Sequence, residues 1–179
     1  DYSFDPKSNH TAPQFLSQSS NLIKNLKDKE PKDIASLMGL SDKLATLNFD
    51  RYQSWRASKT VSNDSKPSMM VFKGDVYQGL DAESLNNKQI KFAQKHLRIL
   101  SGLYGILRPM DVIKPYRLEM GTKLETSKGK NLYDFWGNLI QKNVLQDLQS
   151  QKSDLIINLA SKEYFTILDK YRSFLIVFS

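Results

Sequence analysis

One segment, residues 86–121, constrains the fold more strongly than any other part of the sequence. Its first part predicts an amphipathic helix over residues 86–100, because its apolar side chains recur at helical spacing, at Ile90, Ala93, Leu97 and Leu100. Gly102 and Gly105 follow and are expected to end that helix. Pro109 and Pro115 then force an extended or turning path as far as Gly121, because proline keeps the residue before it out of the helical region.

Apolar patterns elsewhere predict a mixture of helices and short strands. Helices are expected over residues 15–26, with a capped start at Thr11, and over residues 31–38, 43–55 and 132–148. Short apolar runs typical of strands occupy residues 68–76, 154–159 and 174–178, and residues 57–68 are a polar loop. With 179 residues the chain can bury its own core. We therefore expect a mixed α/β (α+β) fold that forms a single domain over residues 1–179.

Positive charge is concentrated in one part of the chain. The formal net charge is +7, and residues 86–130 contain ten Lys or Arg against three Asp or Glu. Helical spacing places Lys88, Lys91, Lys95 and Arg98 on one face. A solvated helix face is the ordinary explanation, but no acidic partner accompanies these cations. The alternative is a surface that attracts a polyanion.

The residue inventory excludes several kinds of chemistry. The chain contains no Cys and only two His, His10 and His96, so thiol catalysis, disulfides and ordinary zinc or iron sites have no ligands to use. We expect neither a metal site nor a cofactor. No apolar run is long enough to cross a membrane and no signal peptide is visible, so we expect a cytoplasmic protein with no membrane partner.

A turn between two predicted helices resembles the helix-hairpin-helix element of DNA-binding proteins. Its residues are Gly39, Leu40, Ser41 and Lys43, where Gly39 suits the tight turn and Lys43 could neutralise a phosphate. Backbone N–H groups at such a turn bind phosphate without reading a base. The alternative is an ordinary helix break in which Ser41 or Asp42 caps the next helix.

Three further segments, residues 72–80, 116–119 and 158–164, place polar groups beside apolar runs. Residues 72–80 carry Lys73, Asp75 and Tyr77 together with two glycines, whose spacing fits neither a P-loop nor a dinucleotide site. The simpler explanation is a turn stabilised by Asp75. Glu119 and Glu163 could act as acid and base if they lay close together. Ion pairs with the neighbouring Arg117 and Lys162 are the alternative.

These segments together resemble the YaaA family of bacterial peroxide-stress resistance proteins. The carrying strings are LSDKLA (40–45), FKGDVY (72–77), HLR (96–98), LSGLYG (100–105), LRP (107–109), PYRLEMG (115–121), YDFW (133–136) and NLASKEY (158–164). The match runs in the family's order and spacing as far as Tyr164. Family members have a short apolar strand before the first residue and a basic stretch after the last. We therefore expect the domain to be incomplete at both ends.

The resemblance implies a YaaA-like topology with a central sheet, surrounding helices, a positively charged cleft and a helix-hairpin-helix element. It implies duplex or structured DNA as the partner, bound through its phosphates, and a role in limiting oxidative DNA damage. It brings no established enzymatic reaction. The DNA-binding residues that it implies are Gly39, Leu40, Ser41, Lys43, Lys73, Arg98, Arg108, Arg117 and Lys162, and the basic stripe adds Lys91 and Lys95.

Two alternatives to DNA binding stay open at this point. An enzyme acting on a nucleotide or a modified base would use a pocket formed by Asp75, Tyr77, Tyr104, Glu119, Asn158, Ser161 and Glu163. An iron-handling protein would need a carboxylate cluster, and no Asp or Glu cluster with ligand spacing is evident in the sequence.

Overall fold

The computed structural model describes residues 10–168 and 175–177. The chain consists of two compact units, Asp1–Glu119 (unit 1) and Met120–Ser179 (unit 2), and each is described by itself. Helices and short strands alternate along both units, so the predicted mixed α/β class is confirmed. The expectation of a single domain stays a prediction. No helix in the described part of the chain has the length and apolar character of a membrane span.

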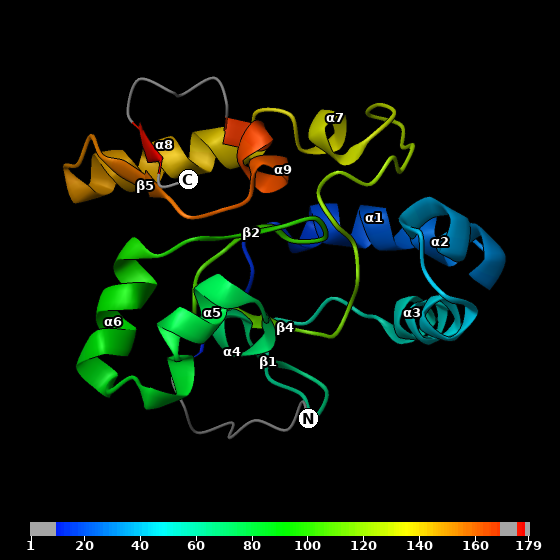
Figure 1. Cartoon of the computed structure of the whole chain (residues 1–179), viewed down its shortest axis with the longest axis horizontal. Coiled ribbons are helices and arrows are strands. Elements are labelled where there is room, and N and C mark those ends of the chain that lie inside the picture. Colours follow the sequence, from blue (N-terminus) through cyan, green and yellow to red (C-terminus); the bar gives the residue numbers. More distant parts are fainter. Residues whose placement is uncertain (1–9, 169–174, 178–179) are drawn as a thin grey trace. The chain divides into compact units, whose positions relative to one another are not determined.

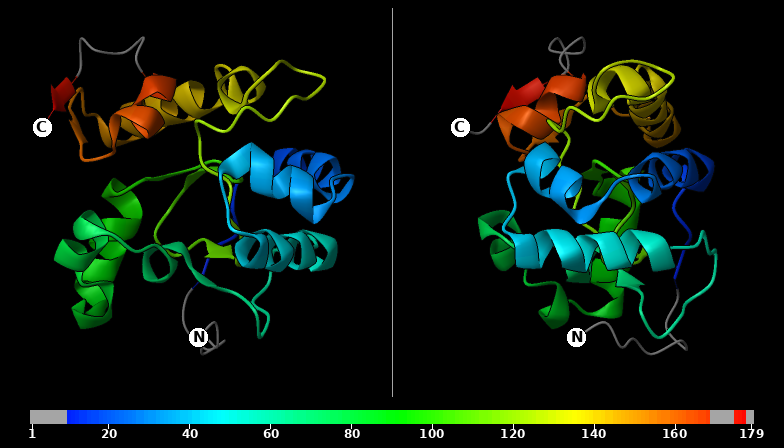
Figure 2. Two further views of the ribbon diagram at one scale, coloured as in Figure 1. Left: turned by 45° about the vertical axis from the view of Figure 1, so that its right-hand side comes forward. Right: turned by 90° about the vertical axis from the view of Figure 1, so that its right-hand side faces the viewer.

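Three helices begin unit 1, namely α1 (Leu16–Lys27), α2 (Pro31–Met38) and α3 (Asp42–Ser54). Helix α3 packs against both of the others (Figures 1 and 2). All three were predicted, but α1 does not begin near Thr11 as expected. The Thr11 hydroxyl instead donates to Asp111 Oδ1 at 2.6 Å, and its backbone bridges to the same residue. A distant partner therefore takes the side chain that could have capped a helix.

The segment after α3 corrects the expected strand over residues 68–76. It forms β1 (Lys66–Pro67), then α4 (Ser68–Val71), α5 (Asp75–Leu80) and the single turn η1 (Ala82–Ser84). The N–H of Ser68 donates to the Asp111 carbonyl at 2.8 Å and that of Met69 to the Pro109 carbonyl at 3.1 Å. These bonds fix the first turn of α4, where Ser68 and Met69 are buried in a helix rather than in a strand.

Helix α6 (Asn87–His96) is the expected amphipathic helix, although it is shorter than predicted. Asn86 Oδ1 accepts the N–H groups of Lys88 and Gln89, and Gln89 Oε1 accepts the N–H of Asn86 in return. The chain becomes extended at Leu97 and enters β2 (Ile99–Ser101), which forms an antiparallel hairpin with β3 (Gly105–Leu107). Arg98 therefore lies beyond the helix, off the basic stripe predicted for it.

Close packing explains the glycine in the turn of this hairpin. A β-carbon on Gly102 would overlap the carbonyl group of Leu118. After β3 the chain turns at Pro109 and enters β4 (Val112–Ile113), which pairs antiparallel with β1. The core of unit 1 gathers around this hairpin and the inner faces of the helices. Its fully buried members include Leu22, Leu26, Ile34, Leu103, Leu107 and Met69.

Unit 2 contains α7 (Leu132–Trp136), α8 (Leu139–Gln151), β5 (Ile156–Asn158), α9 (Lys162–Phe165) and β6 (Leu175–Val177). The single helix expected over residues 132–148 is two helices, because Gly137 takes a φ of 47° that breaks the helical path. Strands β5 and β6 pair in parallel, which confirms the two predicted strands within these bounds. Residues 174 and 178 of the second prediction lie outside the described residues.

The central sheet implied by the resemblance is not present among the described residues. Their strands form three separate two-stranded sheets, β1–β4, β2–β3 and β5–β6. Each strand spans only two or three residues. In β1 the second residue is Pro67, which has no N–H to extend a ladder. Short strands and proline together leave each pair isolated.

Candidate nucleic-acid interface

The exposed face of α6 carries the clearest group of cations in unit 1. Lys88, Lys91 and Lys95 are all exposed, and no acidic residue occurs between Asn86 and Arg98. Arg98 contributes differently, since its Nη1 donates to the carbonyls of Leu97 at 2.8 Å and Gln94 at 3.1 Å. Its guanidinium therefore satisfies carbonyl groups at the end of α6, where the helix dipole favours a cation.

The connection between α2 and α3 is an exposed turn with backbone groups at its surface. Gly39 takes a φ of 60°, the left-handed conformation that ends α2, and the N–H of Leu40 donates to the Ala35 carbonyl at 3.0 Å. Ser41 occupies the N-cap position of α3, but its side chain makes no capping hydrogen bond. Lys43 and Asp42 are both exposed in the first turn of that helix. The first N–H groups of α3 therefore face a cation and a carboxylate.

Arg108 is committed to a buried ion pair. Its Nη2 donates to Asp111 Oδ1 at 2.9 Å and to the Ala12 carbonyl at 3.0 Å, while its backbone N–H donates to Asp111 Oδ2 at 2.7 Å. Asp111 is fully buried, whereas 29% of the Arg108 side chain is exposed. The geometry thus gives Arg108 a role in joining residues 11–12 to the turn at 108–111.

Arg117 and Glu119 form an exposed pair at the end of unit 1. Arg117 Nη2 lies 2.8 Å from Glu119 Oε1, and both side chains are close to half exposed. The Tyr52 hydroxyl, on α3, donates to the Arg117 carbonyl. Burial raises the pKa of Tyr52, because the phenolate would lose its hydration. The sequence left open whether Glu119 is an acid–base group or the ion-pair partner of Arg117, and the structure shows the ion pair.

Aromatic rings form a continuous row through unit 1. Tyr77 stacks on Phe72 at 5.5 Å, Phe72 meets Tyr116 edge-on at 6.5 Å, Tyr116 meets Tyr104 at 5.3 Å and Tyr104 lies 6.4 Å from Trp55. The outer end of the row borders a surface cavity of about 200 Å³ that Lys73 and Tyr77 line together with Met69, Asp81 and Glu83. Burial raises the pKa of Tyr77 to about 12. Asp75 is exposed and does not line this cavity.

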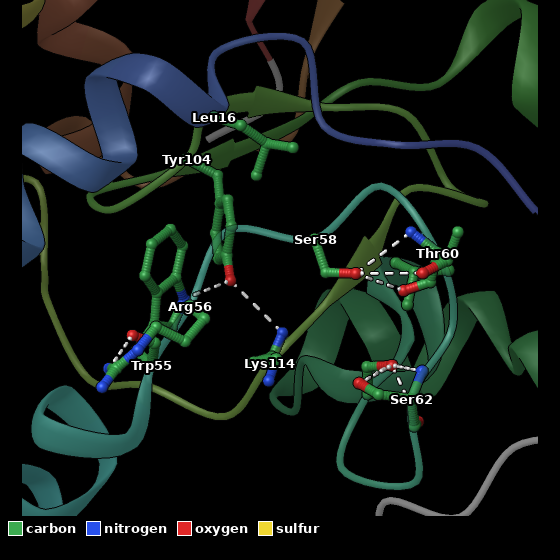
Figure 3. Close-up of a pocket in the computed structure, with 10 residues that line it drawn as sticks. Leu16, Trp55, Arg56, Ser58, Thr60, Ser62, Tyr104 and Lys114 are labelled. Atoms are coloured by element: carbon green, nitrogen blue, oxygen red, sulfur yellow. Dashed lines mark hydrogen bonds between the residues drawn. The ribbon is translucent and has the colours of Figure 1, made fainter.

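The inner end of the row lies at a smaller pocket, shown in Figure 3. The Tyr104 hydroxyl accepts hydrogen bonds from Trp55 Nε1 at 3.0 Å and from the Lys114 N–H at 3.2 Å. Hydroxyl groups of the loop after α3 line the other side, including Ser58, Thr60 and Ser62. Its volume of about 10 Å³ has room for about one water molecule. A nucleotide does not fit into it.

Lys114, which lines this pocket, forms an ion pair with Asp64. Lys114 Nζ lies 3.1 Å from Asp64 Oδ2, and the Ser62 hydroxyl donates to Asp64 Oδ1 at 2.6 Å. Desolvation acts to raise the pKa of Asp64, but the hydrogen bonds from Ser62 and Lys114 outweigh it, so that pKa lies below its ordinary value. Both groups therefore satisfy each other rather than a ligand.

The remaining predicted residues belong to unit 2 and serve local structure there. Asn158 closes a turn through Oδ1, which accepts the Ala160 N–H at 3.0 Å. Ser161 is the N-cap of α9 and Lys162 is exposed in its first turn. Glu163 Oε1 accepts the Gly121 N–H at 2.7 Å, and the Glu163 carbonyl accepts the Tyr133 hydroxyl. Burial, with the Glu163 charge, raises the pKa of Tyr133.

Within each unit, the structure brings together parts of the predicted site. Lys73 and Tyr77 share a cavity and Arg117 pairs with Glu119, all within unit 1, whereas Asn158, Ser161, Lys162 and Glu163 lie in unit 2. Sequence reasoning missed Phe92 and His96, which are exposed beside the lysines of α6. The spacing could have indicated them, because Phe92 lies four residues after Lys88 and His96 four residues after Phe92, which puts all three on one helix face. Within residues 10–168 and 175–177, no group of three His, Asp or Glu side chains could hold a metal ion.

These features describe a mixed α/β protein with three exposed lysines on one short helix of unit 1. A family model described as "Peroxide stress protein YaaA" matches residues 1–178. The chain therefore belongs to the YaaA family of peroxide stress proteins, which confirms the resemblance inferred from its motifs.

Its relatives are bacterial proteins described as UPF0246 proteins. One from Polynucleobacter necessarius subsp. necessarius is 51% identical over 158 residues, which are 88% of this chain and 61% of that protein. One from Aliivibrio fischeri (strain MJ11) is 52% identical over 160 residues, or 89% of this chain and 61% of that protein. One from Cupriavidus metallidurans is 50% identical over 173 residues, or 94% and 66%. The chain thus spans about three fifths of the length of the first two relatives.

Proposed function

We propose that this protein binds the phosphate backbone of DNA without reading its sequence. The observation that carries the proposal is the exposed face of α6, where Lys88, Lys91 and Lys95 follow one another with no carboxylate between Asn86 and Arg98. Phosphate neutralisation by such cations releases counterions and supplies affinity that is independent of the base sequence.

The turn between α2 and α3 supports the proposal as a second phosphate contact. It combines a left-handed Gly39, an uncapped N-cap at Ser41 and an exposed Lys43. Backbone N–H groups at a helix start, next to a lysine, suit a phosphate oxygen. This arrangement is what a helix-hairpin-helix element would use, and on this proposal residues 39–43 take that role. Arg108, Arg98 and Arg117 contribute less, because their guanidinium groups already bind protein oxygens.

The test is the salt dependence of binding to a fluorescent duplex. Log affinity should fall linearly with log salt concentration, with a slope of about −0.9 for each phosphate contacted. Replacing Lys88, Lys91 and Lys95 together by Ala should make the slope shallower by about 2 to 3. The matched control replaces Lys24, Lys32 and Lys59, three exposed lysines elsewhere in unit 1. An affinity insensitive to salt, or equal losses in both triple variants, would contradict the proposal.

The family's description connects this binding to peroxide stress. We propose that the protein limits oxidative damage to DNA in the cytoplasm by occupying its backbone. Plasmid DNA exposed to ferrous iron and peroxide should be nicked less in the presence of the protein than in its absence. The triple variant at Lys88, Lys91 and Lys95 should protect less. Equal protection by both proteins would separate the stress role from DNA binding.

A second candidate, an enzyme acting on a nucleotide or modified base, has one observation in its favour. The cavity of about 200 Å³ in unit 1 combines the Phe72 and Tyr77 rings with Lys73 and two carboxylates, Asp81 and Glu83. Of the residues predicted for this pocket, only Tyr77 lines it. Protection of Tyr77 from nitration by added nucleoside monophosphates tests this candidate, and unchanged nitration counts against it.

A further inference from the structure

We propose that the exposed face of α6 binds single-stranded DNA, with an unpaired base stacked on the Phe92 ring. The inference rests on the proposed DNA binding and adds the form of DNA that this face accepts. Two independent features of α6 carry it: an aromatic ring in solvent, and lysines placed around that ring.

Phe92 is unusually exposed for an aromatic residue. Its relative accessibility is 66%, the highest of the large apolar side chains in the described part of the chain. The buried side of α6 is formed around Ala93, so the fold leaves the Phe92 ring outside its core. Covering this ring with a partner would remove apolar surface from water, which is favourable.

His96 prepares this ring as a stacking platform. The two ring centroids lie 4.1 Å apart with an interplanar angle of 27°, and His96 Nδ1 lies 2.9 Å from the Phe92 carbonyl. The histidine ring is therefore fixed by a hydrogen bond as well as by the stack. Because a ring held in one orientation loses little further freedom on binding, such a pair is preorganised for a flat ligand.

The lysines determine which flat ligand fits. Lys88 lies four residues before Phe92 and Lys95 three residues after it, so helical spacing brings both to the same face, with Lys91 beside them. Bases flanked by phosphates match this pattern of one ring among cations, which is typical of surfaces that bind single strands. A base within an intact duplex is already stacked on its neighbours and offers no free face. The lysines can contact the phosphates of either form of DNA, whereas the Phe92 ring adds a contact that only an unpaired stretch can make.

The test compares a dT oligomer with a duplex hairpin at low salt, for the protein and for three Phe92 variants. Phe92→Ala should weaken binding to the oligomer roughly ten-fold, since base–aromatic stacking is typically worth about 1–3 kcal/mol, and should change duplex affinity less than about two-fold. Phe92→Leu should behave like Phe92→Ala, because it keeps apolar bulk but has no π face. Phe92→Tyr should retain binding. Leu47→Ala, at an exposed apolar residue of α3, is the matched control and should change neither affinity.

A strand carrying 2-aminopurine gives a second readout, since stacking alters the fluorescence of that base. The change should occur with the protein and with Phe92→Tyr, and should disappear with Phe92→Ala. Three results would overturn the inference and leave the proposed function intact. Phe92→Ala could affect both DNAs equally, it could affect neither, or the protein could bind only the duplex. If neither DNA binds at low salt, the proposed function fails first.

Discussion

Arg108 holds the buried carboxylate of Asp111 from two sides. Its backbone N–H donates to Oδ2 at 2.7 Å, and its Nη2 donates to Oδ1 at 2.9 Å. The same carboxylate accepts the Thr11 hydroxyl, while the Asp111 carbonyl accepts the Ser68 N–H. The turn at 108–111 thus ties together segments from three distant parts of unit 1.

Asp111→Ala should therefore destabilise the protein strongly. Removing the carboxylate takes away the buried acceptor of hydrogen bonds from the Arg108 backbone, the Arg108 guanidinium and the Thr11 hydroxyl, a change that typically costs about 3–5 kcal/mol of unfolding free energy. Urea denaturation measures the loss. Glu119→Ala removes the partner of an exposed arginine and is the matched control, with an expected cost below about 1 kcal/mol. Similar losses of unfolding free energy in the two variants would show that the hydrogen bonds to the Asp111 carboxylate do not stabilise the fold more than an exposed ion pair does.

Gly102→Ala should also destabilise the protein, for a steric reason. A β-carbon at this position would lie 2.9 Å from the Leu118 carbonyl carbon and 3.0 Å from that of Glu119, so the hairpin or the opposing backbone must shift. Overpacking of this kind typically costs about 1–3 kcal/mol. Gly79, in α5, has no atom near the position of a new β-carbon. Gly79→Ala should accordingly stabilise by about 0.4–1 kcal/mol, and a loss of stability there would contradict the open geometry.

Stability should fall at alkaline pH because several tyrosines are buried. The folded-state pKa of Tyr77 is raised to about 12, and those of Tyr52 and Tyr133 are raised as well. Below pH 10 these phenols are protonated in both states, so their contribution is fully present. Between about pH 10 and 12 the unfolded chain releases protons that the folded chain keeps, and stability therefore declines with rising pH.

Urea denaturation across that pH range, together with phenolate absorbance, checks this expectation. Tyr77→Phe should make the decline less steep, because one of the linked protons is removed. Tyr2 lies outside the described residues, and Tyr2→Phe provides a control for the loss of one phenol from the chain. An identical slope in Tyr77→Phe and in the unaltered protein would exclude the proposed linkage for this residue.

Local patterns in the sequence were enough to predict most of the helices. Helices α2, α3 and α6 follow periodic apolar positions and turn residues that act within a few neighbours, such as Gly39 after α2 and Asn86 before α6. Two of the misjudged elements, at residues 68–76 and at Thr11, depend on distant partners. Ser68 and Met69 form a helical turn because they bond to residues 109–111, and Thr11 does not cap a helix because Asp111 takes its hydroxyl. No periodicity within residues 68–76 contains that information.

The candidate site divides in the same way. The α6 lysines were predicted from helical spacing alone, since exposure of a charged stripe needs no tertiary knowledge. Arg98 and Arg108 were predicted as cations but act on protein oxygens, at the end of α6 and on the buried Asp111. Which protein oxygens a guanidinium finds depends on how the chain folds back, so sequence spacing could not predict these contacts. The DNA contacts expected of both residues stay a prediction.

Asp42 and Lys43 provide opposite tests of the α2–α3 turn as a phosphate contact. Both are exposed in the first turn of α3, beside the N–H groups that would bind the phosphate. Lys43→Ala should weaken binding by a similar factor on any duplex sequence and make the salt slope shallower by about 0.9. Asp42→Asn should strengthen binding about two- to five-fold, because a carboxylate near the phosphate repels it. Asp50→Asn, which removes an exposed carboxylate further along α3, is the matched control and should have a smaller effect. If Asp42→Asn and Asp50→Asn strengthen binding equally, only net charge is at work, and the turn does not contact the DNA.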